Sequence, residues 1–289
     1  MKFGANTFIW ADHFDAEQTA LLERLRQAGF DGIEIPLIEP KSMRTADVRR
    51  AIERSGLACT VCSVLPPGLS TLSDDTGIRK KTREHLMRCI AATAELSASV
   101  IAGPLYAPVG YLPGHRRTQE EWKRAVECFQ QLGSTLDEHN VHLAIEPLNR
   151  YETYFLNTAA DAVQLCRQIQ HPRIGILFDT YHANIEEKNI GKAISACGSY
   201  LFHVHSCEND RGIPGSGHVD WSGVAAALHD VKYDGWLTIE GFGFSLGALS
   251  AAASIWRDLA PTPDDIAFEG LPFLRQLLSK ANSNRVATS

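Results

Sequence analysis

The stretch HLAIEPLNRYE, from His142 to Glu152, decides the expected fold. Its first four residues form a short apolar run that is typical of a buried strand. The strand ends at Glu146, because Pro147 has no N–H to contribute to a sheet. A carboxylate at the tip of a buried strand needs a partner, since an unpaired buried charge is very costly. We therefore expect the rest of the chain to supply a partner for Glu146.

Three later stretches share this design, an apolar run with one ligand-type residue at its C-terminal tip. The runs and the residues that end them are 173–178 with Asp179, 200–204 with His205, and 235–239 with Glu240. Helical segments separate these stretches. The same strand type therefore recurs with a glutamate, an aspartate, a histidine and a second glutamate at its end.

Strands and helices alternate along the whole chain. The expected strands are 3–8, 32–36, 58–64, 99–103, 142–146, 174–179, 201–205 and 236–240. The expected helices are 15–28, 45–55, 78–96, 118–139, a segment from 158, 190–197 and 221–229. Eight βα units with continuous apolar strands indicate a parallel sheet that closes on itself, so we predict an α/β protein with a (β/α)8 TIM barrel. A doubly wound open sheet is the alternative, but it would bind a ligand at one switch point rather than across four strand tips.

We expect a single barrel domain over residues 1–289, because no repeat, low-complexity tract or linker interrupts the pattern. Additional C-terminal helices are expected within 245–281, at 246–259 and 264–281. The first of them could cover the barrel or pair with another subunit. The polar tail, 282–289, is expected to be loose.

Composition narrows the classes of function. The net charge of −6 and the pI near 6.0 provide no basic field to gather phosphates, so nucleic acid is a poor partner. No apolar run approaches a membrane span, and the N-terminus has no signal-peptide pattern. Seven cysteines are scattered along the chain; Cys59 and Cys62 have CxxC spacing but lie in a strand pattern, which favours buried thiols. A reducing cytoplasm is the expected compartment.

The tips of consecutive strands in a closed parallel barrel lie on one rim, where barrel enzymes place their chemistry. Four residues should therefore converge: Glu146, Asp179, His205 and Glu240. Three carboxylates and an imidazole crowd together only if a cation neutralises them. Oxygen-rich ligation with one nitrogen suits Mn²⁺, Mg²⁺ or Co²⁺ better than structural zinc. The alternative, unrelated polar strand ends, needs a coincidence at matching positions of four strands.

Side-chain parity distinguishes two histidines of one strand. His203 and His205 lie two residues apart, so both face the barrel interior. His205 is nearer the rim and is the expected ligand. His203 lies one layer deeper and is expected to support the ligand or the core rather than bind the metal.

A second set of polar residues lies just beyond the strand tips. Its members are Glu152, His182 and Arg211. Each alone could be a solvated loop residue, but loops beyond catalytic strands position substrates. We therefore expect this set to contact a substrate.

Four motifs resemble those of the ketose 3-epimerases, the family of D-tagatose, D-psicose and L-ribulose 3-epimerases among the xylose isomerase-like TIM barrels. The motifs are EPLNRYE (146–152), FDTYHAN (178–184), HVHSCENDRGIPGSG (203–217) and TIEGF (238–242). The resemblance extends over nearly the whole chain, from FGANTFIW through AGFDGIEIP to the last strand.

The resemblance implies a divalent metal, usually Mn²⁺, held at the four strand tips, and it implies that Glu146 and Glu240 form the acid/base pair. It also implies that Glu152, His182 and Arg211 hold the substrate around O1 to O3. Two further positions are similar to pocket-lining positions of the family: Trp10 and Cys62. Together with the apolar C-terminal helices, the resemblance implies a homodimer or homotetramer.

One segment departs from the family pattern. Family members often carry a tryptophan in the loop after the fourth strand, whereas the segment 106–110, YAPVG, has none. One wall of the pocket therefore differs, which leaves the preferred sugar open.

The implied reaction inverts C3 of a free ketose through an enediolate, with the metal as Lewis acid and one glutamate on each face. The sequence has no glycine-rich phosphate loop with a lysine, which favours an unphosphorylated sugar. A sugar or hydroxypyruvate isomerase, or an inosose dehydratase, on the same scaffold would share the metal carboxylates. Glu152 together with Arg211 argues for the longer ketose chain.

Two more distant alternatives predict different sequences. A DNA repair enzyme like endonuclease IV would need more metal histidines and a basic face, which the net charge of −6 opposes. A non-catalytic sugar-binding barrel would lack one of the two catalytic glutamates, and both are present.

Overall fold

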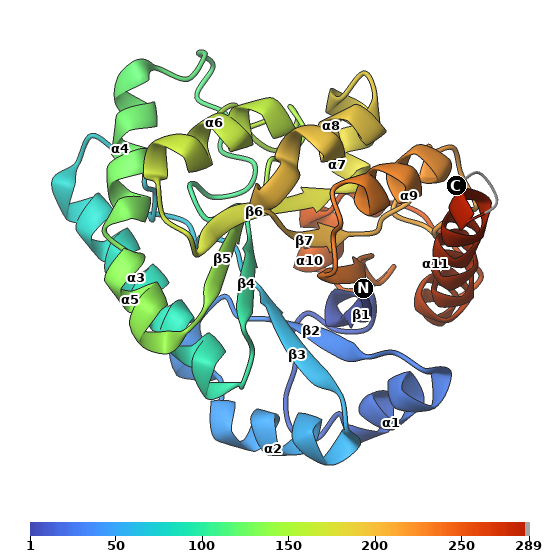
Figure 1. Ribbon diagram of the computed structural model, residues 1–289. Helices are drawn as coiled ribbons and strands as arrows, with labels where there is room; N and C mark the ends of the chain where they lie inside the picture. The colour runs from blue at the N-terminus through green and yellow to red at the C-terminus, as the bar shows by residue number, and fades with distance from the viewer. Residues whose placement is uncertain (287–289) are drawn as a thin grey trace.

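The computed structural model describes residues 1–286, whose eight strands form one closed parallel barrel in the order β1-β2-β3-β4-β5-β6-β7-β8. The strands are β1 (Lys2–Asn6), β2 (Gly32–Pro36), β3 (Ala58–Cys62), β4 (Val100–Gly103), β5 (His142–Ile145), β6 (Ile174–Asp179), β7 (Leu201–His205) and β8 (Trp236–Ile239). Figure 1 shows these strands at the centre of the molecule with the helices around them. The predicted (β/α)8 TIM barrel is confirmed.

Helices follow the strands in turn. They are α1 (Thr19–Ala28), α2 (Thr45–Ser55), α3 (Thr76–Glu95), α4 (Gln119–Gln130), α5 (Gly133–His139), α6 (Ala159–Ile169), α7 (Thr180–Glu186), α8 (Ile190–Cys197), α9 (Trp221–Asp230), α10 (Ala248–Ala252) and α11 (Pro263–Val286), with short 3-10 turns η1 (Thr7–Ile9), η2 (Pro40–Ser42) and η3 (Gly198–Tyr200). Two of these differ from the sequence interpretation. The expected helix 118–139 is divided into α4 and α5, and α7 occupies a segment that was expected to be a loop.

The C-terminal region also differs in detail. The helix expected over 246–259 is only the short α10, whereas α11 extends beyond the expected end at 281 and includes the first residues of the expected tail. The last three residues of that tail lie outside the described part of the chain. Within the described residues, no helix is long and apolar enough to cross a membrane.

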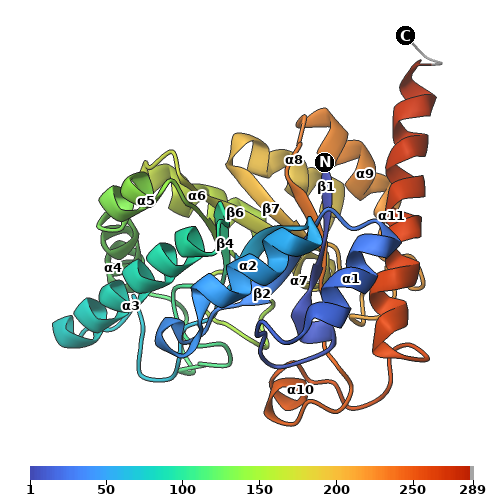
Figure 2. The same cartoon turned by 90° about the horizontal axis from the view of Figure 1, so that it is seen from below.

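α11 completes the outer ring. It lies beside α9 in Figure 1, and its ion pair between Asp264 and Arg24 joins it to α1. Ile266 and Leu274 are buried on its inner side, because the helix covers the outer face of the barrel near β8. Figure 2 shows α10 projecting at the end of the barrel opposite the N-terminus, which is the end that carries the strand tips.

The barrel interior is polar at one level. Asn6, Glu34 and Thr60 are in register on β1, β2 and β3, and all three are buried. Below the other strand tips, the apolar residues Ala102, Ala144 and Leu177 form a separate buried cluster with Val100. The interior is therefore packed with side chains, and polar groups concentrate where the β2 and β7 side chains meet.

Gly103 connects this packing to the strand tip of β5. Its φ is +139°, and its carbonyl oxygen accepts a hydrogen bond from the backbone N–H of Glu146 at 3.0 Å. A Cβ at this position would lie 2.0 Å from the carbonyl oxygen of Ser63, so the backbone of β4 approaches β3 as closely as only glycine allows.

We expect Gly103→Ala to destabilise the protein by about 1–3 kcal/mol more than Gly110→Ala, because it adds overpacking to the strain of a positive φ. Gly110 is the matched control, with a φ of +81° and no atom within 4 Å of an added Cβ. Urea unfolding of both variants measures the difference. Equal destabilisation would show that the approach of β4 to β3 is not tight.

Candidate active site

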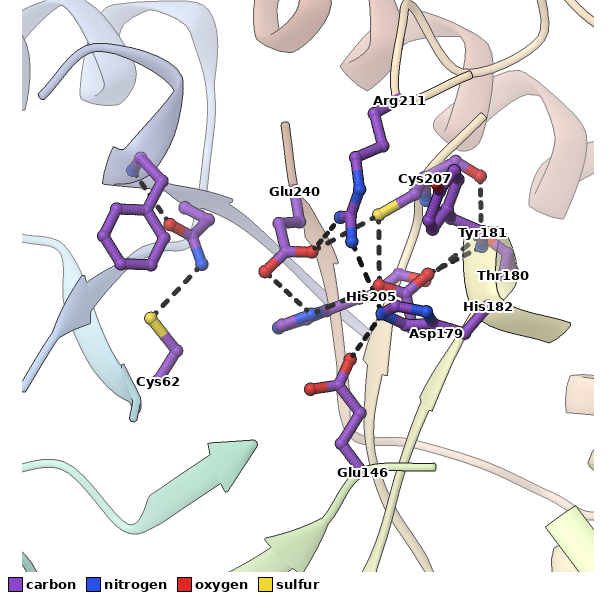
Figure 3. Close-up of polar contacts among 12 residues, drawn as sticks. Cys62, Glu146, Asp179, Thr180, Tyr181, His182, His205, Cys207, Arg211 and Glu240 are labelled. Atoms are coloured by element: carbon purple, nitrogen blue, oxygen red, sulfur yellow. Dashed lines mark hydrogen bonds and ion pairs between the residues drawn. The ribbon is translucent and has the colours of Figure 1, made fainter. Parts of the chain in front are cut away.

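The four strand-tip residues converge at the mouth of the barrel, as Figure 3 shows. Each is at most 7% exposed: Glu146, Asp179, His205 and Glu240. Asp179 and His205 are the last residues of β6 and β7, and the two glutamates follow β5 and β8 directly. Parallel closure of the barrel therefore brings residues that are far apart in sequence into one small volume.

His205 is the geometric centre of this group. Its Nδ1 lies 3.3 Å from Oε1 of Glu240 and 3.8 Å from Oδ2 of Asp179. In Figure 3, Glu146 and Glu240 lie on opposite sides of the His205 ring. Glu146 shares a second cluster with Asp179 and His182, in which the potential ligand atoms lie within 4.8 Å of one another.

The electrostatics of the group favour a bound cation. Burial raises the pKa of Glu146 well above its ordinary value, and the nearby carboxylates of Glu240 and Asp179 raise it further. His205 Nδ1 is buried and has no hydrogen-bond partner among the described residues. Three carboxylate groups around a buried imidazole nitrogen fit a divalent cation with mostly oxygen ligands. The residues present are therefore suited to the metal that the sequence predicted.

Glu34 on β2 supports His205 from below and was not identified from the sequence. His205 Nε2 donates to its Oε1 at 2.7 Å, which leaves Nδ1 directed at the carboxylates. His203 Nε2 lies 2.7 Å from its Oε2, so His203 occupies the deeper layer. Asn6 and Thr60 donate to the same carboxylate at 3.0 Å each. The signal in the sequence was a charged residue inside the apolar strand GIEIP.

The surroundings of Glu34 favour the ionised carboxylate. Burial opposes ionisation, but the adjacent imidazoles of His205 and His203 outweigh it and hold the pKa well below its ordinary value. An ionised Glu34 accepts hydrogen bonds only, so it fixes His205 with the proton on Nε2.

Arg211 reaches into the group from the loop after β7. Its Nη1 donates to Oε2 of Glu240 at 2.7 Å, and its guanidinium stacks on the rings of Tyr181 and Phe242 at 4.1 and 4.7 Å. The residue has a φ of +65°, and its side chain is 4% exposed. Arg211 thus adds a fixed positive charge beside Glu240.

Glu208 holds the loop that carries Arg211. Its buried carboxylate accepts four N–H groups, from the backbone of Asn209, Val219 and Gly215 and from the Trp221 indole, at 2.7–3.0 Å. The anchoring role of Glu208 was not predicted, because nothing in the spacing of a loop glutamate shows that the chain folds back on it. The loop is therefore anchored without a cation.

His182 and Glu152 are joined through Asn149. The backbone N–H and the side-chain amide of Asn149 lie 3.1 and 3.0 Å from His182 Nδ1, and the amide also donates to Oε1 of Glu152 at 2.8 Å. Burial lowers the pKa of His182, so the neutral ring carries its proton on Nε2. That nitrogen lies 3.6 Å from Oε1 of Glu146.

A cavity of about 240 Å³ opens above this group. Its polar lining residues are the two glutamates of the strand tips with Glu152, His182, His205 and Arg211. Its apolar lining residues include Phe8, Ile38, Val64, Val109, Phe242 and Leu249. Asp179 does not border the cavity and is buried. The cavity therefore offers both hydrogen-bonding groups and apolar surface to a ligand.

Two further residues, Cys62 and Trp10, were expected to line the pocket, and only the first of them borders this cavity. Cys62 borders the cavity, and its Sγ accepts from the amide of Asn6 at 3.4 Å. Trp10 does not border it: its indole donates to Asp264 at 2.6 Å, and its ring packs against Phe268. The structure therefore places Trp10 outside this cavity, because η1 turns this side chain toward α11.

The loop after β4, which has no tryptophan, contributes Pro104 and Val109 to the cavity. Tyr106 is buried away from it, with its ring 5.2 Å from that of Phe155. Small aliphatic groups therefore form the wall that differs from the family pattern.

A sequence model of the xylose isomerase-like TIM barrel family matches residues 22–277, and the chain belongs to this family. It is 36% identical over 276 residues to a probable ketose 3-epimerase of Synechocystis sp., covering 96% of each chain. It is 30% identical to a D-psicose 3-epimerase of Ruminiclostridium cellulolyticum, covering 92% of each. The crystal structure of a D-allulose 3-epimerase from Methylomonas sp. in complex with D-allulose has a TM-score of 0.90 at 29% identity, over 96% of each chain.

The resemblance that the four motifs indicated is confirmed by these relatives. These relatives are epimerases, which belong to the carbohydrate isomerases. The expected enzyme class, a carbohydrate isomerase, is therefore also confirmed.

We expect Glu34→Gln to weaken Mn²⁺ binding about 10- to 100-fold, because a glutamine presents an N–H group to donors that need an acceptor and no longer fixes the His205 tautomer. Isothermal titration of the metal-free protein measures the affinity. Glu39→Gln, at an exposed position just beyond the same strand, is the matched control and should leave it unchanged. Unaltered binding by Glu34→Gln would remove Glu34 from the support of His205.

The affinity for Mn²⁺ should rise with pH. In the metal-free protein the pKa of Glu146 is raised by burial and neighbouring carboxylates, and that of His205 is raised because Glu240 and Glu34 outweigh burial. Both groups must lose a proton to bind a cation, so each contributes about a tenfold loss of affinity per pH unit below its raised pKa. Calorimetry in buffers of different ionisation enthalpy should count one to two protons released, and one fewer for Glu146→Gln. Binding without proton release would contradict the raised values.

Proposed function

We propose that this protein epimerises free ketoses at C3. The observation that carries the proposal is that Glu146 and Glu240 border one cavity from opposite sides of the His205 ring. Inversion at a carbon requires one group to remove a proton from one face and another group to return a proton to the other face. Two buried glutamates at the ends of β5 and β8 suit this task, and the epimerases among the relatives support the assignment.

The metal centre would consist of Glu146, Asp179, His205 and Glu240. A divalent cation held there, Mn²⁺ or alternatively Mg²⁺ or Co²⁺, would supply Lewis-acid polarisation of the ketose oxygens. The buried Nδ1 of His205, which faces the carboxylates of Glu240 and Asp179, and the carboxylate of Glu146 support this ligand set.

Proton transfer is assigned to the two glutamates. Glu146 borders the cavity, and a cation bound at the strand tips would keep its carboxylate ionised and able to accept the C3 proton. Nη1 of Arg211 donates a hydrogen bond to Oε2 of Glu240 at 2.7 Å and so orients this carboxyl group. The reaction is reversible, so each glutamate serves as acid in one direction and as base in the other.

The polar lining residues of the cavity are assigned to the first three carbons of the ketose. His182, with its proton on Nε2, and Arg211 both donate hydrogen bonds, which suits the carbonyl group of the sugar and the charge that forms in an enediolate. Glu152 accepts from hydroxyl groups of the same carbons. The remaining carbons would contact the apolar lining residues. Assembly as a homodimer or homotetramer, and a cytoplasmic location, stay predictions.

We expect the metal-free protein to be inactive and Mn²⁺ to restore conversion of a ketose to its C3 epimer in D₂O, with deuterium at C3. D-fructose, D-tagatose and L-ribulose should be compared, with NMR of the products as the measurement. Glu146→Gln and Glu240→Gln should each lower the rate at least about 100-fold, because each removes one proton-transfer group. Glu120→Gln, at an exposed position on α4, is the control.

The position of the deuterium decides between reactions. Deuterium at C1 or C2 with formation of an aldose would make the protein an aldose–ketose isomerase and would contradict the proposal. Exchange at C3 that persists in both glutamine variants would contradict the assignment of the two glutamates.

A further inference from the structure

Cys207 lies against the carboxylates of the proposed metal centre, although the proposed reaction assigns no role to it. Its side chain is fully buried two residues beyond β7, and Figure 3 shows its sulfur beside Asp179 and Glu240. Sγ is 3.4 Å from Oδ2 of Asp179 and 3.8 Å from Oε2 of Glu240. The three residues form a buried group whose potential ligand atoms lie within 4.8 Å of one another.

The backbone of Cys207 is held in this position by Thr180, the residue after Asp179. The Thr180 hydroxyl donates to the carbonyl oxygen of Cys207 at 2.6 Å and accepts from its N–H at 2.8 Å. Asp179 in turn caps α7 through a hydrogen bond from the Tyr181 N–H to Oδ1 at 2.6 Å. Oδ2 of Asp179 therefore remains directed toward the sulfur. Hydrogen bonds thus hold both Cys207 and Asp179 in place.

A second observation indicates that a cation belongs between these groups. His205 Nδ1 is buried without a hydrogen-bond partner among the described residues. It is directed at the same two carboxylates, 3.8 Å from Asp179 and 3.3 Å from Glu240. The sulfur of Cys207 and the imidazole nitrogen of His205 thus approach the same two carboxylates.

The spacing agrees with tetrahedral ligation. Zinc binds sulfur at about 2.3 Å and carboxylate oxygen at about 2.0–2.2 Å, so tetrahedral neighbours are separated by about 3.6 Å. The observed sulfur–oxygen distances of 3.4 and 3.8 Å lie on either side of this value. Small side-chain shifts would bring the sulfur and the two carboxylates to one ion, and His205 Nδ1, which lies within 3.8 Å of both carboxylates, would be the fourth ligand.

We propose that Cys207 supplies a sulfur ligand through which this centre binds thiophilic divalent cations, Zn²⁺ and Cd²⁺, together with Asp179, His205 and Glu240. The cation replaces the thiol proton, which is released to solvent, and the sulfur binds as thiolate. The inference rests on the proposed metal centre, because three of the ligands are shared. Thiophilic cations and Mn²⁺ therefore compete for one position.

The binding mode has a consequence for selectivity. Soft sulfur ligands favour zinc-type cations over Mn²⁺ and Mg²⁺, which prefer oxygen. Replacing the sulfur by oxygen should therefore reduce the preference for thiophilic cations while leaving the carboxylates in place.

The test is titration of the metal-free protein with Cd²⁺, followed by ultraviolet absorption of the thiolate-to-cadmium charge transfer. Cys207→Ser is close in shape and keeps the backbone contacts with Thr180, and circular dichroism checks its fold. Cys62→Ser is the matched control, because Cys62 is the thiol that borders the cavity. The affinities for Cd²⁺ and Mn²⁺ are measured for all three proteins.

We expect the absorption band at one Cd²⁺ per chain in the unchanged protein and in Cys62→Ser, and its loss in folded Cys207→Ser. The ratio of Cd²⁺ to Mn²⁺ affinity should fall at least about tenfold in Cys207→Ser, because only the softer ion depends on sulfur. A band that persists in Cys207→Ser, or stoichiometric Cd²⁺ binding without a band in the unchanged protein, would overturn the inference.

These readouts are independent of the proposed reaction. If the charge-transfer band depends on Cys207 but no ketose exchanges deuterium, the sulfur ligand stands and the epimerase proposal fails. If deuterium enters C3 but the band does not depend on Cys207, the epimerase proposal stands and the sulfur ligand fails.

Discussion

The mutual repulsion of three buried carboxylates is the constraint on which the rest of the site depends. Glu146, Asp179 and Glu240 are at most 7% exposed, and buried charges that lie close together interact strongly because screening by water is weak. Arg211 offsets one negative charge through its contact with Glu240. Two remain. One divalent ion would balance them with His205 neutral, whereas without the ion the pKa values of Glu146 and His205 are both raised, so that protons on these two groups balance the charge.

The hydrogen bonds beneath the rim give this charge cluster a defined shape. Glu34 accepts from Asn6, Thr60 and His205, so a single ionised carboxylate in the barrel interior orients the imidazole above it. Tight packing of β4 on β3 at Gly103 places the backbone that receives the N–H of Glu146. Precise placement at the mouth thus derives from interior contacts that no substrate touches.

The sequence was sufficient to predict the barrel and the residues at the strand tips. Apolar runs that end in ligand-type residues place these residues on one rim of the barrel when the strands are parallel. The alternation of side chains along β7 likewise predicted that His203 lies in the deeper layer, where it contacts Glu34. Groups that meet only through folding were not predictable. Cys207 approaches Asp179 because Thr180 clamps its backbone, and Glu208 is reached by a loop that turns back on itself.

Errors arose where local pattern and tertiary packing disagree. The sequence of α7 resembles a loop with a histidine, but Asp179 caps it and makes it a helix. Trp10 follows the first strand as a pocket residue would, but the turn η1 directs its indole to Asp264. In both cases a single hydrogen bond between distant or adjacent elements determined the outcome.

The anchoring of the loop after β7 has a bearing on how the enzyme is assembled in a cell. Four N–H groups satisfy Glu208, so the segment that carries Arg211 is complete before any ion arrives. The newly made polypeptide can therefore reach its final form as an apoprotein and acquire its ion afterwards. Which ion it carries is then decided by the metal ions available to the folded protein and not by the folding pathway.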